Sequence, residues 1–224
     1  VEGLGSRFSK DMNDTIRFLS FSDPNVQFVV LGTMILGATA AMVGSFSFLR
    51  KRALVGDAIA HSILPGVCLS FLISGEKDPL WLIIGAIISG WLSLLMIDGI
   101  SRTTKLKSDA AIGIVLSVFF GIGILLLTMI QHSGNAAQAG LDKFLFGKAA
   151  SLSRDDIMVF GGIGLFLIIV VLLLYKEFKL ISFNPDYAKV IGLPVKFLEF
   201  LLATITILAV AVGIQAVGVV LMAA

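Results

Sequence analysis

Charged residues and cysteines are scarce in this sequence of 224 residues, and each shortage restricts what the protein can be. Asp, Glu, Lys and Arg together make up 14% of the residues, whereas soluble domains contain about 25%. The net charge of +2 is too small to indicate a nucleic-acid partner. The single cysteine, Cys68, excludes an internal disulfide bond and a metal site built from several cysteines.

Two sequence signals are missing as well. The glycine-rich Walker loop of nucleotide-binding proteins does not occur, so we expect no ATP hydrolysis by that route in this chain. The first residues are polar and have no continuous apolar core, so they do not form a secretory signal. Residues 1–24 are expected to be an extracytoplasmic or interfacial segment. An interfacial helix is one interpretation, because apolar side chains recur there at helical spacing: Leu4, Phe8, Met12, Ile16 and Leu19. A disordered segment is the other interpretation.

Apolar residues, in contrast, are abundant: 57% of the sequence is hydrophobic and the mean hydropathy is +1.00. About 20 apolar residues in a helix cross the core of a bilayer. The sequence therefore predicts an all-α, polytopic transmembrane helix bundle with at least six spans. They are expected near Val26–Phe48, Asp57–Ile73, Leu80–Ile100, Ala110–Ile130 and Ile157–Tyr175, and from Phe197 onward. No polar stop signal follows the last of these, so we expect further spans.

The distribution of Lys and Arg among the loops predicts the orientation, since cytoplasmic loops are richer in these residues. The loops after the first, third and fifth spans are basic and are expected in the cytoplasm, which places the N-terminus outside. These loops contain Arg50, Lys51 and Arg52; Arg102, Lys105 and Lys107; and Lys176, Lys179, Lys189 and Lys196.

Residues 131–156 form a long loop that is predicted outside the membrane, with an apolar cluster at Leu141, Phe144, Leu145 and Phe146. Loops of this length inside compact domains tend to be functional. Two interpretations are open. The loop rests on the membrane surface or binds a partner, or it is a short interfacial helix that only covers the bundle.

The segment SFNPDYAKVIGLPV, residues 182–195, contains a complete set of helix boundary signals. Asn184 suits the N-cap, Pro185 the first helical position, and Asp186 the positively polarised first turn. Gly192 can end the helix in the left-handed conformation, before a proline that prevents its continuation. We expect a rigid cytoplasmic helix of about two turns that acts on another protein. A surface helix that only shortens a loop is the alternative.

Asp57 and His61 are ionisable residues at the start of the second predicted span, and such residues usually mark a pathway. Because they are four residues apart on a helix, their side chains lie on one face. A carboxylate together with an imidazole suits Mn, Fe or Zn. Alternatively, Asp57 caps the helix and pairs with Arg50 or Arg52. That alternative does not explain His61 or Pro65, which can kink the helix.

Two further residues are weaker candidates for the same pathway. Cys68 is seven residues beyond His61, near the same stripe of the helix, and could add a soft ligand. A single buried cysteine is more often a packing residue. Gln215 carries an amide within the sixth span, where it can also bond a neighbouring helix.

Four stretches of the sequence carry a resemblance to a known family. They are FLRKRALVGDAIAHSILPGV (48–67), AGLDKFLFGKAASLSRDD (139–156), FNPDYAKVIGLPV (183–195) and, more weakly, QAVGVVLMAA (215–224). The first is the most specific, because basic residues precede the pattern GDAxxHxxLPG. Over residues 25–224 the sequence resembles the permease subunits of ABC transporters that import manganese, zinc or iron, the metal ABC-3 permease family.

The resemblance implies roles for the residues described above. Asp57 and His61 would bind metal in the translocation pathway. The helix at about 184–193 would be the coupling helix that docks on an ATPase. That helix with its flanks comprises Phe183, Asn184, Pro185, Asp186, Ala188, Gly192 and Leu193. Residues 25–224 would be a permease domain whose C-terminal part is absent, because the family continues to about eight spans.

The resemblance also implies partners and a location. A second permease copy, or a close paralogue, would complete a dimer and set two Asp57–His61 pairs against one another. A separate ABC ATPase subunit would hydrolyse ATP, and an extracytoplasmic metal-binding protein would deliver the ion. No cofactor would be bound permanently, since Mn²⁺, Zn²⁺ or Fe²⁺ is the cargo. The location would be a bacterial cell membrane.

Two other functions compete with this interpretation. A secondary transporter could exchange a cation for protons through Asp57 and His61, although further intramembrane charges for a proton relay are missing from the sequence. An intramembrane enzyme would need Ser62 or Ser45 as nucleophile and His61 as base. Ser62 is adjacent to His61, so the two side chains face different sides of a helix, and the motif GxSxG is absent.

Overall fold

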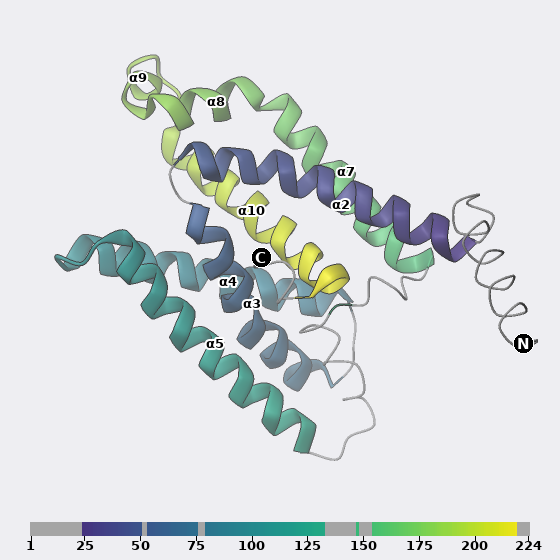
Figure 1. Cartoon of the computed structure of the whole chain (residues 1–224). Coiled ribbons are helices and arrows are strands. Elements are labelled where there is room, and N and C mark those ends of the chain that lie inside the picture. Colours follow the sequence, from purple (N-terminus) through teal and green to yellow (C-terminus); the bar gives the residue numbers. More distant parts are fainter. Residues whose placement is uncertain (1–23, 51–52, 76–78, 133–146, 148–153, 219–224) are drawn as a thin grey trace, which may run out of the picture.

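The computed structural model describes residues 24–50, 53–75, 79–132, 147 and 154–218. All regular secondary structure in these residues is helical, which confirms the predicted all-α class. The helices, which Figure 1 shows packed into a bundle, are α2 (Pro24–Leu49), α3 (Ala53–Ser74), α4 (Pro79–Thr103), α5 (Ser108–His132), α7 (Arg154–Leu173), α8 (Tyr175–Phe183), α9 (Pro185–Val190) and α10 (Val195–Val217).

The long apolar helices match the predicted membrane spans. Five of the described helices, α2, α3, α4, α5 and α10, are each long and apolar enough to cross a bilayer. A sixth span results if α7 and α8, which follow one another with a bend of 67°, cross as one unit. The predicted multi-pass bundle is therefore confirmed, and the bend in its fifth span is a feature that the sequence did not predict.

The bend between α7 and α8 lies at Leu174, whose φ of −102° and ψ of 20° interrupt the helix. The short helix α8 is amphipathic, since Phe178 and Ile181 are buried whereas Lys176 and Lys179 are exposed. A helix of this kind is suited to the membrane surface rather than to the hydrocarbon core. The bend thus directs the amphipathic helix α8 away from the axis of α7.

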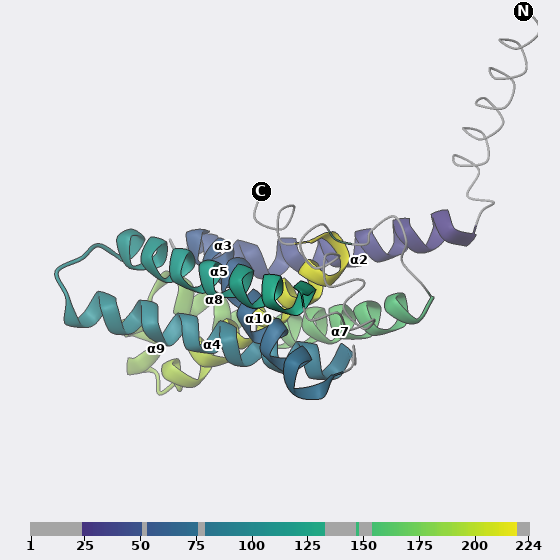
Figure 2. The ribbon, with the colours of Figure 1, turned by 90° about the horizontal axis from the view of Figure 1, so that it is seen from below.

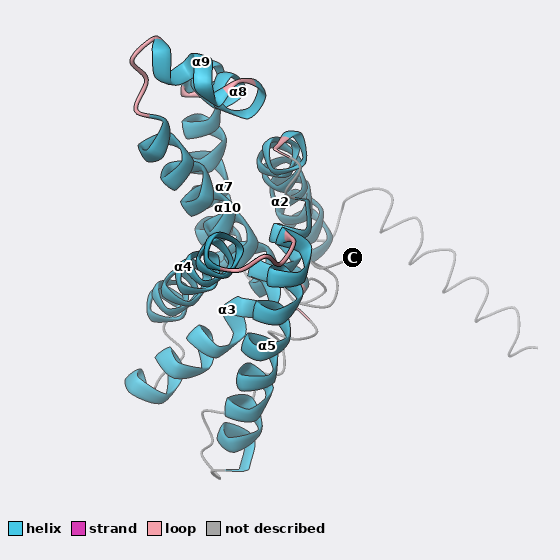
Figure 3. Cartoon of the chain, turned by 90° about the vertical axis from the view of Figure 1, so that its left-hand side faces the viewer, coloured by secondary structure: helices cyan, strands magenta, loops and turns pink. Residues whose placement is uncertain are grey.

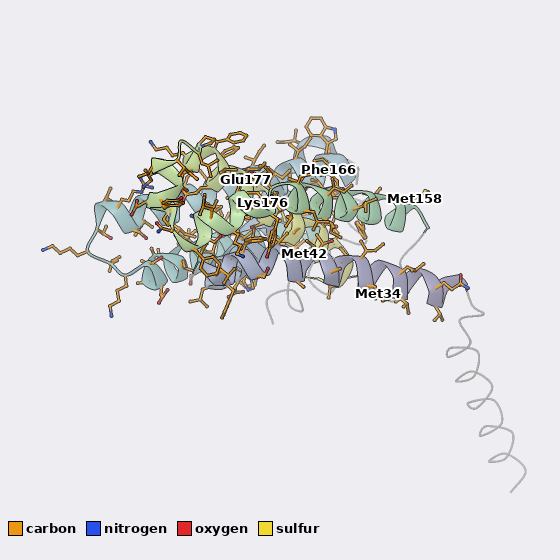
Figure 4. All side chains as sticks on the ribbon, turned by 90° about the horizontal axis from the view of Figure 1, so that it is seen from above. Met34, Met42, Met158, Phe166, Lys176 and Glu177 are labelled. Atoms are coloured by element: carbon orange, nitrogen blue, oxygen red, sulfur yellow. The ribbon has the colours of Figure 1, made fainter. Side chains whose placement is uncertain are left out.

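The outer surface of α2 and α7 is apolar. Met34 on α2 and Met158 and Phe166 on α7 are largely exposed, and Figure 4 shows them along these two neighbouring helices. The charged residues Lys176 and Glu177 lie beyond the bend, at the other end of this surface. A large exposed apolar surface is expected where a protein meets lipid.

The helices form two groups that α10 joins. The first group consists of α3, α4 and α5, two of which, α4 and α5, run side by side in Figure 2. The second group consists of α2, α7, α8 and α9. Figure 3 shows α10 between the two groups. It packs on both groups along its length: Val195, Leu198, Val212 and Ala216 lie in clusters with the second group, and Ile207 and Ile214 lie in a cluster with the first group.

The helices α3 and α4 approach one another closely along a line of small residues. A Cβ atom added to Gly66 would lie 2.1 Å from the Gly85 carbonyl oxygen, and one added to Gly85 would lie 1.9 Å from the Ser70 hydroxyl. Across the same contact, the Ser89 hydroxyl donates a hydrogen bond of 2.5 Å to the Ser62 carbonyl oxygen. Small residues let transmembrane helices pack at this distance, and the contact fixes the position of α3.

The three basic connections lie at the same end of the bundle. Arg50 at the end of α2, Arg102 in α4 and Lys196 in α10 all line one cavity. In Figure 1 this end is at the left, together with α9 and the start of α3. The arrangement agrees with the predicted orientation, in which these connections are cytoplasmic.

Candidate metal-ion site

Asp57 and His61 lie one turn apart in the first turns of α3. This helix begins at Ala53, so Asp57 lies within the helix and not at its cap. The Oδ1 atom of Asp57 and the Nε2 atom of His61 are 3.3 Å apart. Arg50 forms its ion pair with Glu199. Asp57 therefore neither caps the helix nor pairs with Arg50; Arg52 lies outside the described residues, so a pair of Asp57 with Arg52 stays a prediction.

The surroundings of the pair orient it but leave two of its atoms without partners. Phe120 of α5 contacts the His61 ring edge to face, with ring centroids 4.8 Å apart and an interplanar angle of 80°. Among the described residues, Asp57 Oδ1 and His61 Nδ1 have no hydrogen-bond partner. The contact of 3.3 Å between Asp57 Oδ1 and His61 Nε2 does not count as one, because it is not directed as a hydrogen bond. The side chains of His61 and Asp57 are 19% and 37% exposed, so a ligand can approach them.

The separation of the two atoms suits a shared metal ion. Nitrogen and oxygen ligands lie about 2.1 Å from a tetrahedral zinc ion, so two of them are about 3.4 Å apart. The observed distance of 3.3 Å between Asp57 Oδ1 and His61 Nε2 is close to this value. In the described part of the chain, no third His, Cys, Asp or Glu joins the two. One chain therefore offers half of a tetrahedral site.

The other residues considered for the pathway lie elsewhere. Cys68 is fully buried, and its thiol is 3.9 Å from the Gly123 carbonyl oxygen of α5, so it packs between two helices. Gln215 is buried in the last turns of α10, at the opposite end of the bundle from Asp57. A pathway role for Cys68 and Gln215 stays a prediction.

Ser62, the nucleophile of the enzyme alternative, is fully buried, and its hydroxyl has no hydrogen-bond partner among the described residues, so it is not bonded to His61. His61 contacts Phe120 of α5 instead. A nucleophile and its base need to lie within hydrogen-bond reach of one another, and these two side chains form no hydrogen bond with one another. The geometry thus supports a metal or proton site over an intramembrane enzyme.

The start of α9 has the predicted cap. The Asn184 Oδ1 atom accepts a hydrogen bond of 3.0 Å from the backbone N–H of Tyr187, and Pro185 occupies the first helical position. Asp186 lies in the first turn and forms an ion pair of 2.9 Å with Lys189. The boundary signals read from the sequence are therefore confirmed at this end.

The end of α9 is closed by a glycine. The helix has six residues, Pro185–Val190, slightly fewer than expected. Gly192 has a φ of +85°, and its N–H donates to the Lys189 carbonyl while the N–H of Leu193 donates to the Ala188 carbonyl. These two bonds form a Schellman motif, which favours glycine at this position. The predicted stop at Gly192 is thus confirmed.

One side of α9 is anchored and the other is free. Ala188 is fully buried in a cluster with α2, α8 and α10. Tyr187 and Ile191 are half exposed, and Val190 is 83% exposed, so apolar side chains project from α9 at this end of the bundle. An exposed apolar patch is typical of a contact with another protein.

Two of the predicted segments lie outside the described residues. The outer loop at 131–156 is described only at its edges and at Gly147, and its apolar cluster at 141–146 is not described. The segment 1–23 is not described either. The interpretations of both segments stay predictions.

The sequence pattern of a family described as the ABC 3 transport family matches residues 22–224. The chain belongs to the ABC 3 transport family. The resemblance seen in the four sequence stretches is thereby confirmed at the level of the family. With its five or six apolar helices, this ABC 3 family member is a multi-pass protein of a bacterial cytoplasmic membrane.

Relatives of this ABC 3 family member are named for metal transport. A manganese transport system membrane protein of Bacillus subtilis is 51% identical over 207 residues, which are 92% of this chain and 48% of the relative. A zinc transport system membrane protein of Treponema pallidum is 45% identical over 91% of this chain and 68% of the relative. The chain spans about half the length of the first relative and about two thirds of the second.

The fold of this ABC 3 family member also matches a solved structure. PsaBC from Streptococcus pneumoniae, in complex with Fab, has a chain that superposes with a TM-score of 0.80 at 32% sequence identity. The match covers 93% of this chain and 73% of that chain. The helical arrangement described above is therefore that of a known transporter fold.

One charged contact of this ABC 3 family member was missed in the sequence. Arg50 at the end of α2 and Glu199 in the first turns of α10 form an ion pair between their Nη2 and Oε1 atoms. A signal was present, because a carboxylate within an apolar span needs a partner. The sequence does not indicate which of the nearby cations that partner is.

Proposed function

We propose that the chain is the permease subunit of an ATP-driven importer of divalent transition metal ions: manganese, zinc or iron. Asp57 and His61 hold the ion during its passage. One observation carries this proposal: a carboxylate and an imidazole lie 3.3 Å apart in an apolar helix, with atoms that lack hydrogen-bond partners in the described structure. The names of the manganese and zinc relatives support the same class of cargo.

A second copy of the chain, or a close paralogue, supplies the remaining ligands in this proposal. Two ligands leave a tetrahedral ion half coordinated, and a twofold axis brings an equal pair from the other copy. Partly exposed ligands that are shared between two chains can bind an ion and release it again when the chains move apart. A transport site needs both properties.

The helix α9 docks on a separate ABC ATPase subunit in this proposal. Support comes from its rigid ends at Asn184 and Gly192 and from its exposed apolar side. Closure of the ATPase subunits on ATP would then push on α9. Because Ala188 is buried among α2, α8 and α10, a push on α9 reaches the bundle.

The outer side of the bundle receives the metal from an extracytoplasmic binding protein in this proposal. The ion then passes towards the cytoplasmic end of α3, where Asp57 lies. Imidazole suits zinc and iron, and carboxylate suits manganese. The Asp57–His61 pair therefore fits a class of divalent cargo, and selection among these metals would fall to the binding protein.

The proposal is tested by transport in a reconstituted system. The complete protein is co-expressed with its ATPase and placed in vesicles, and uptake of Mn²⁺, Zn²⁺ and Fe²⁺ is followed with and without ATP. We expect uptake that requires ATP and that is lost in the variant Asp57→Ala/His61→Ala, while the ATPase still co-purifies. Uptake that ignores ATP and follows a proton gradient would instead assign the pair to a secondary transporter.

A further inference from the structure

Arg50 and Glu199 form an ion pair that connects two distant parts of the chain. Arg50 is at the end of α2, and Glu199 is the fifth residue of α10. The Arg50 side chain is only 17% exposed, so solvent screens the pair less than it would screen a pair on the surface. Neither residue belongs to the candidate metal site or to α9.

On the Glu199 side, the pair is connected to α9. Val195 and Leu198, in the same turns of α10, are buried in one cluster with Ala188 of α9 and with Phe178 of α8. Packed interiors transmit displacement because they contain few voids. A movement of α9 therefore moves the first turns of α10 and carries Glu199 with them.

On the Arg50 side, the pair is connected to the metal site. Arg50 is three residues before Ala53, where α3 begins, and Asp57 and His61 follow within the next two turns. A displacement of Arg50 therefore displaces the start of α3, the helix that carries both proposed ligands.

A cavity of about 360 Å³ lies beside the ion pair and leaves room for such a movement. Arg50 and Glu199 line it, together with Val55 and Ile59 of α3 and with Trp91 of α4. A close-packed contact at this place would resist a shift of the start of α3. The end of α2 and the first turns of α10 are therefore joined here by a charged contact next to open space.

We propose that Arg50 and Glu199 are positioning residues that transmit the movement of α9 to Asp57 and His61. This inference rests on the proposed function. The ion pair holds the α2–α3 connection to α10, so that a displacement of α9 changes the distance between the metal-holding pair and its counterpart in the second copy. Neither residue touches the ion.

The experiment uses the complete transporter with its ATPase in vesicles and compares Arg50→Gln, Glu199→Gln and the exchanged pair Arg50→Glu/Glu199→Arg. Three quantities are measured: co-purification of the ATPase, equilibrium binding of Mn²⁺, and Mn²⁺ taken up per ATP hydrolysed. Coupling between sites typically changes an affinity by about 5- to 150-fold. We expect uptake per ATP to fall by about tenfold in each single variant, and the exchanged pair to recover at least half of it. Mn²⁺ binding and co-purification should stay unchanged.

The pair Asp98 and Arg102 provides the matched control. These residues line the same cavity, but both belong to α4 and lie 3.9 Å apart at i and i+4, so their contact joins no two helices. Arg102→Gln should leave uptake per ATP within about twofold of the wild type, as expected for an exposed pair.

Two results would overturn the inference while leaving the proposed function intact. One is wild-type uptake per ATP in both single variants. The other is an exchanged pair that is no better than the single variants, because a merely structural loss of packing would not be rescued by reversed charges. The variant Arg50→Lys, which keeps the charge, should retain most of the uptake even if Arg50→Gln assembles poorly. Wild-type protein without ATP-driven uptake would instead contradict the proposed function itself.

Discussion

At the scale of single residues, the chemistry of the candidate site depends on the few polar atoms that lack partners. Asp57 Oδ1 and His61 Nδ1 have no hydrogen bond in the described structure, in a helix where most neighbouring side chains are apolar and buried. Leaving buried polar atoms unsatisfied destabilises the protein unless another partner is present. A bound cation or a second chain would provide that partner.

Replacement of either ligand should remove metal binding without unfolding the protein. In Asp57→Ala or His61→Ala, we expect equilibrium binding of Mn²⁺ to weaken by more than tenfold, since loss of even an indirect partner of a metal commonly costs 10- to 100-fold. In Asp57→Ala the thermal midpoint should not fall, because one unsatisfied atom is removed with the side chain. Asp98→Ala is the control, as this carboxylate lies in α4 and pairs with Arg102. Equal loss in the control variant would show that general surface charge, and not the pair, attracts the metal.

The glycine contact between α3 and α4 supports a second prediction. In Gly85→Ala, the new methyl group would lie 1.9 Å from the Ser70 hydroxyl and 2.3 Å from the Gly66 carbonyl oxygen. Because a backbone atom cannot move aside easily, we expect a loss of about 1–3 kcal/mol, as in other overpacked cores. The measurement is the thermal midpoint in detergent.

Gly113→Ala is the matched control for that prediction. An added Cβ at Gly113 in α5 meets no atom within 4 Å, so only the higher helix propensity of alanine remains. This variant should be as stable as the wild type or slightly more stable. If Gly85→Ala behaved in the same way, the close approach of α3 and α4 would be disproved.

At the scale of single elements, α9 shows how a helix of six residues can be well defined. Isolated helices this short are unstable in water. The Asn184 cap, the Schellman closure at Gly192 and the burial of Ala188 together replace the missing length. The result is a fixed projection at the cytoplasmic end whose apolar side remains uncovered.

A charge on the exposed side of α9 should separate the ATPase from the bundle. We expect Val190→Asp to reduce co-purification of the ATPase by at least about tenfold, because an apolar anchor at the centre of an interface commonly contributes 2 kcal/mol or more. Leu106→Asp is the control: this exposed residue lies in the connection between α4 and α5, at the same end of the bundle. Similar losses in both variants would mean that α9 is not the specific docking element.

At the scale of the whole molecule, two helix groups share α10, and a cavity lies between them at the end where α3 and α10 begin. The metal pair belongs to the first group and α9 to the second. Such a division allows one group to shift relative to the other while each keeps its own core. An alternating pathway requires a movement of this kind.

The proposed sharing of one ion by two copies predicts the behaviour of mixed dimers. Complexes with one wild-type copy and one Asp57→Ala/His61→Ala copy can be isolated with two different tags. If four ligands from two chains hold the ion, mixed complexes should lose nearly all uptake, since two ligands alone bind a tetrahedral ion poorly. About half of the wild-type uptake in these complexes would show that each chain has a pathway of its own.

Much of this architecture was readable from the sequence, because a membrane imposes strong constraints on composition. Long apolar runs have few alternatives to spanning helices, and the caps of α9 use residues whose backbone preferences are local. Asp57 and His61 were selected as candidates for a similar reason. Ionisable residues in an apolar helix are costly to place in a membrane, so two of them on one face indicate a functional site. These features depend on residues that are near one another in the chain.

The sequence did not indicate the bend of 67° at Leu174, because no proline or glycine occurs at the bend. It also did not select Glu199 as the partner of Arg50, since the two residues are 149 positions apart. Both depend on which helices become neighbours.

The sequence by itself determined the class of protein, the apolar helices, the limits of α9 and the placement of Asp57 and His61 on one face of a helix; their binding of metal stays a prediction. Local physical rules govern each of these: helix caps, the hydropathy of a span, and the spacing of one helical turn. Only the tertiary structure decided that α10 joins two groups, that Gly66 and Gly85 meet, and that an ion pair beside a cavity lies between α9 and the metal pair. These features arise from contacts between distant segments, and packing selects such contacts only when the whole chain is folded.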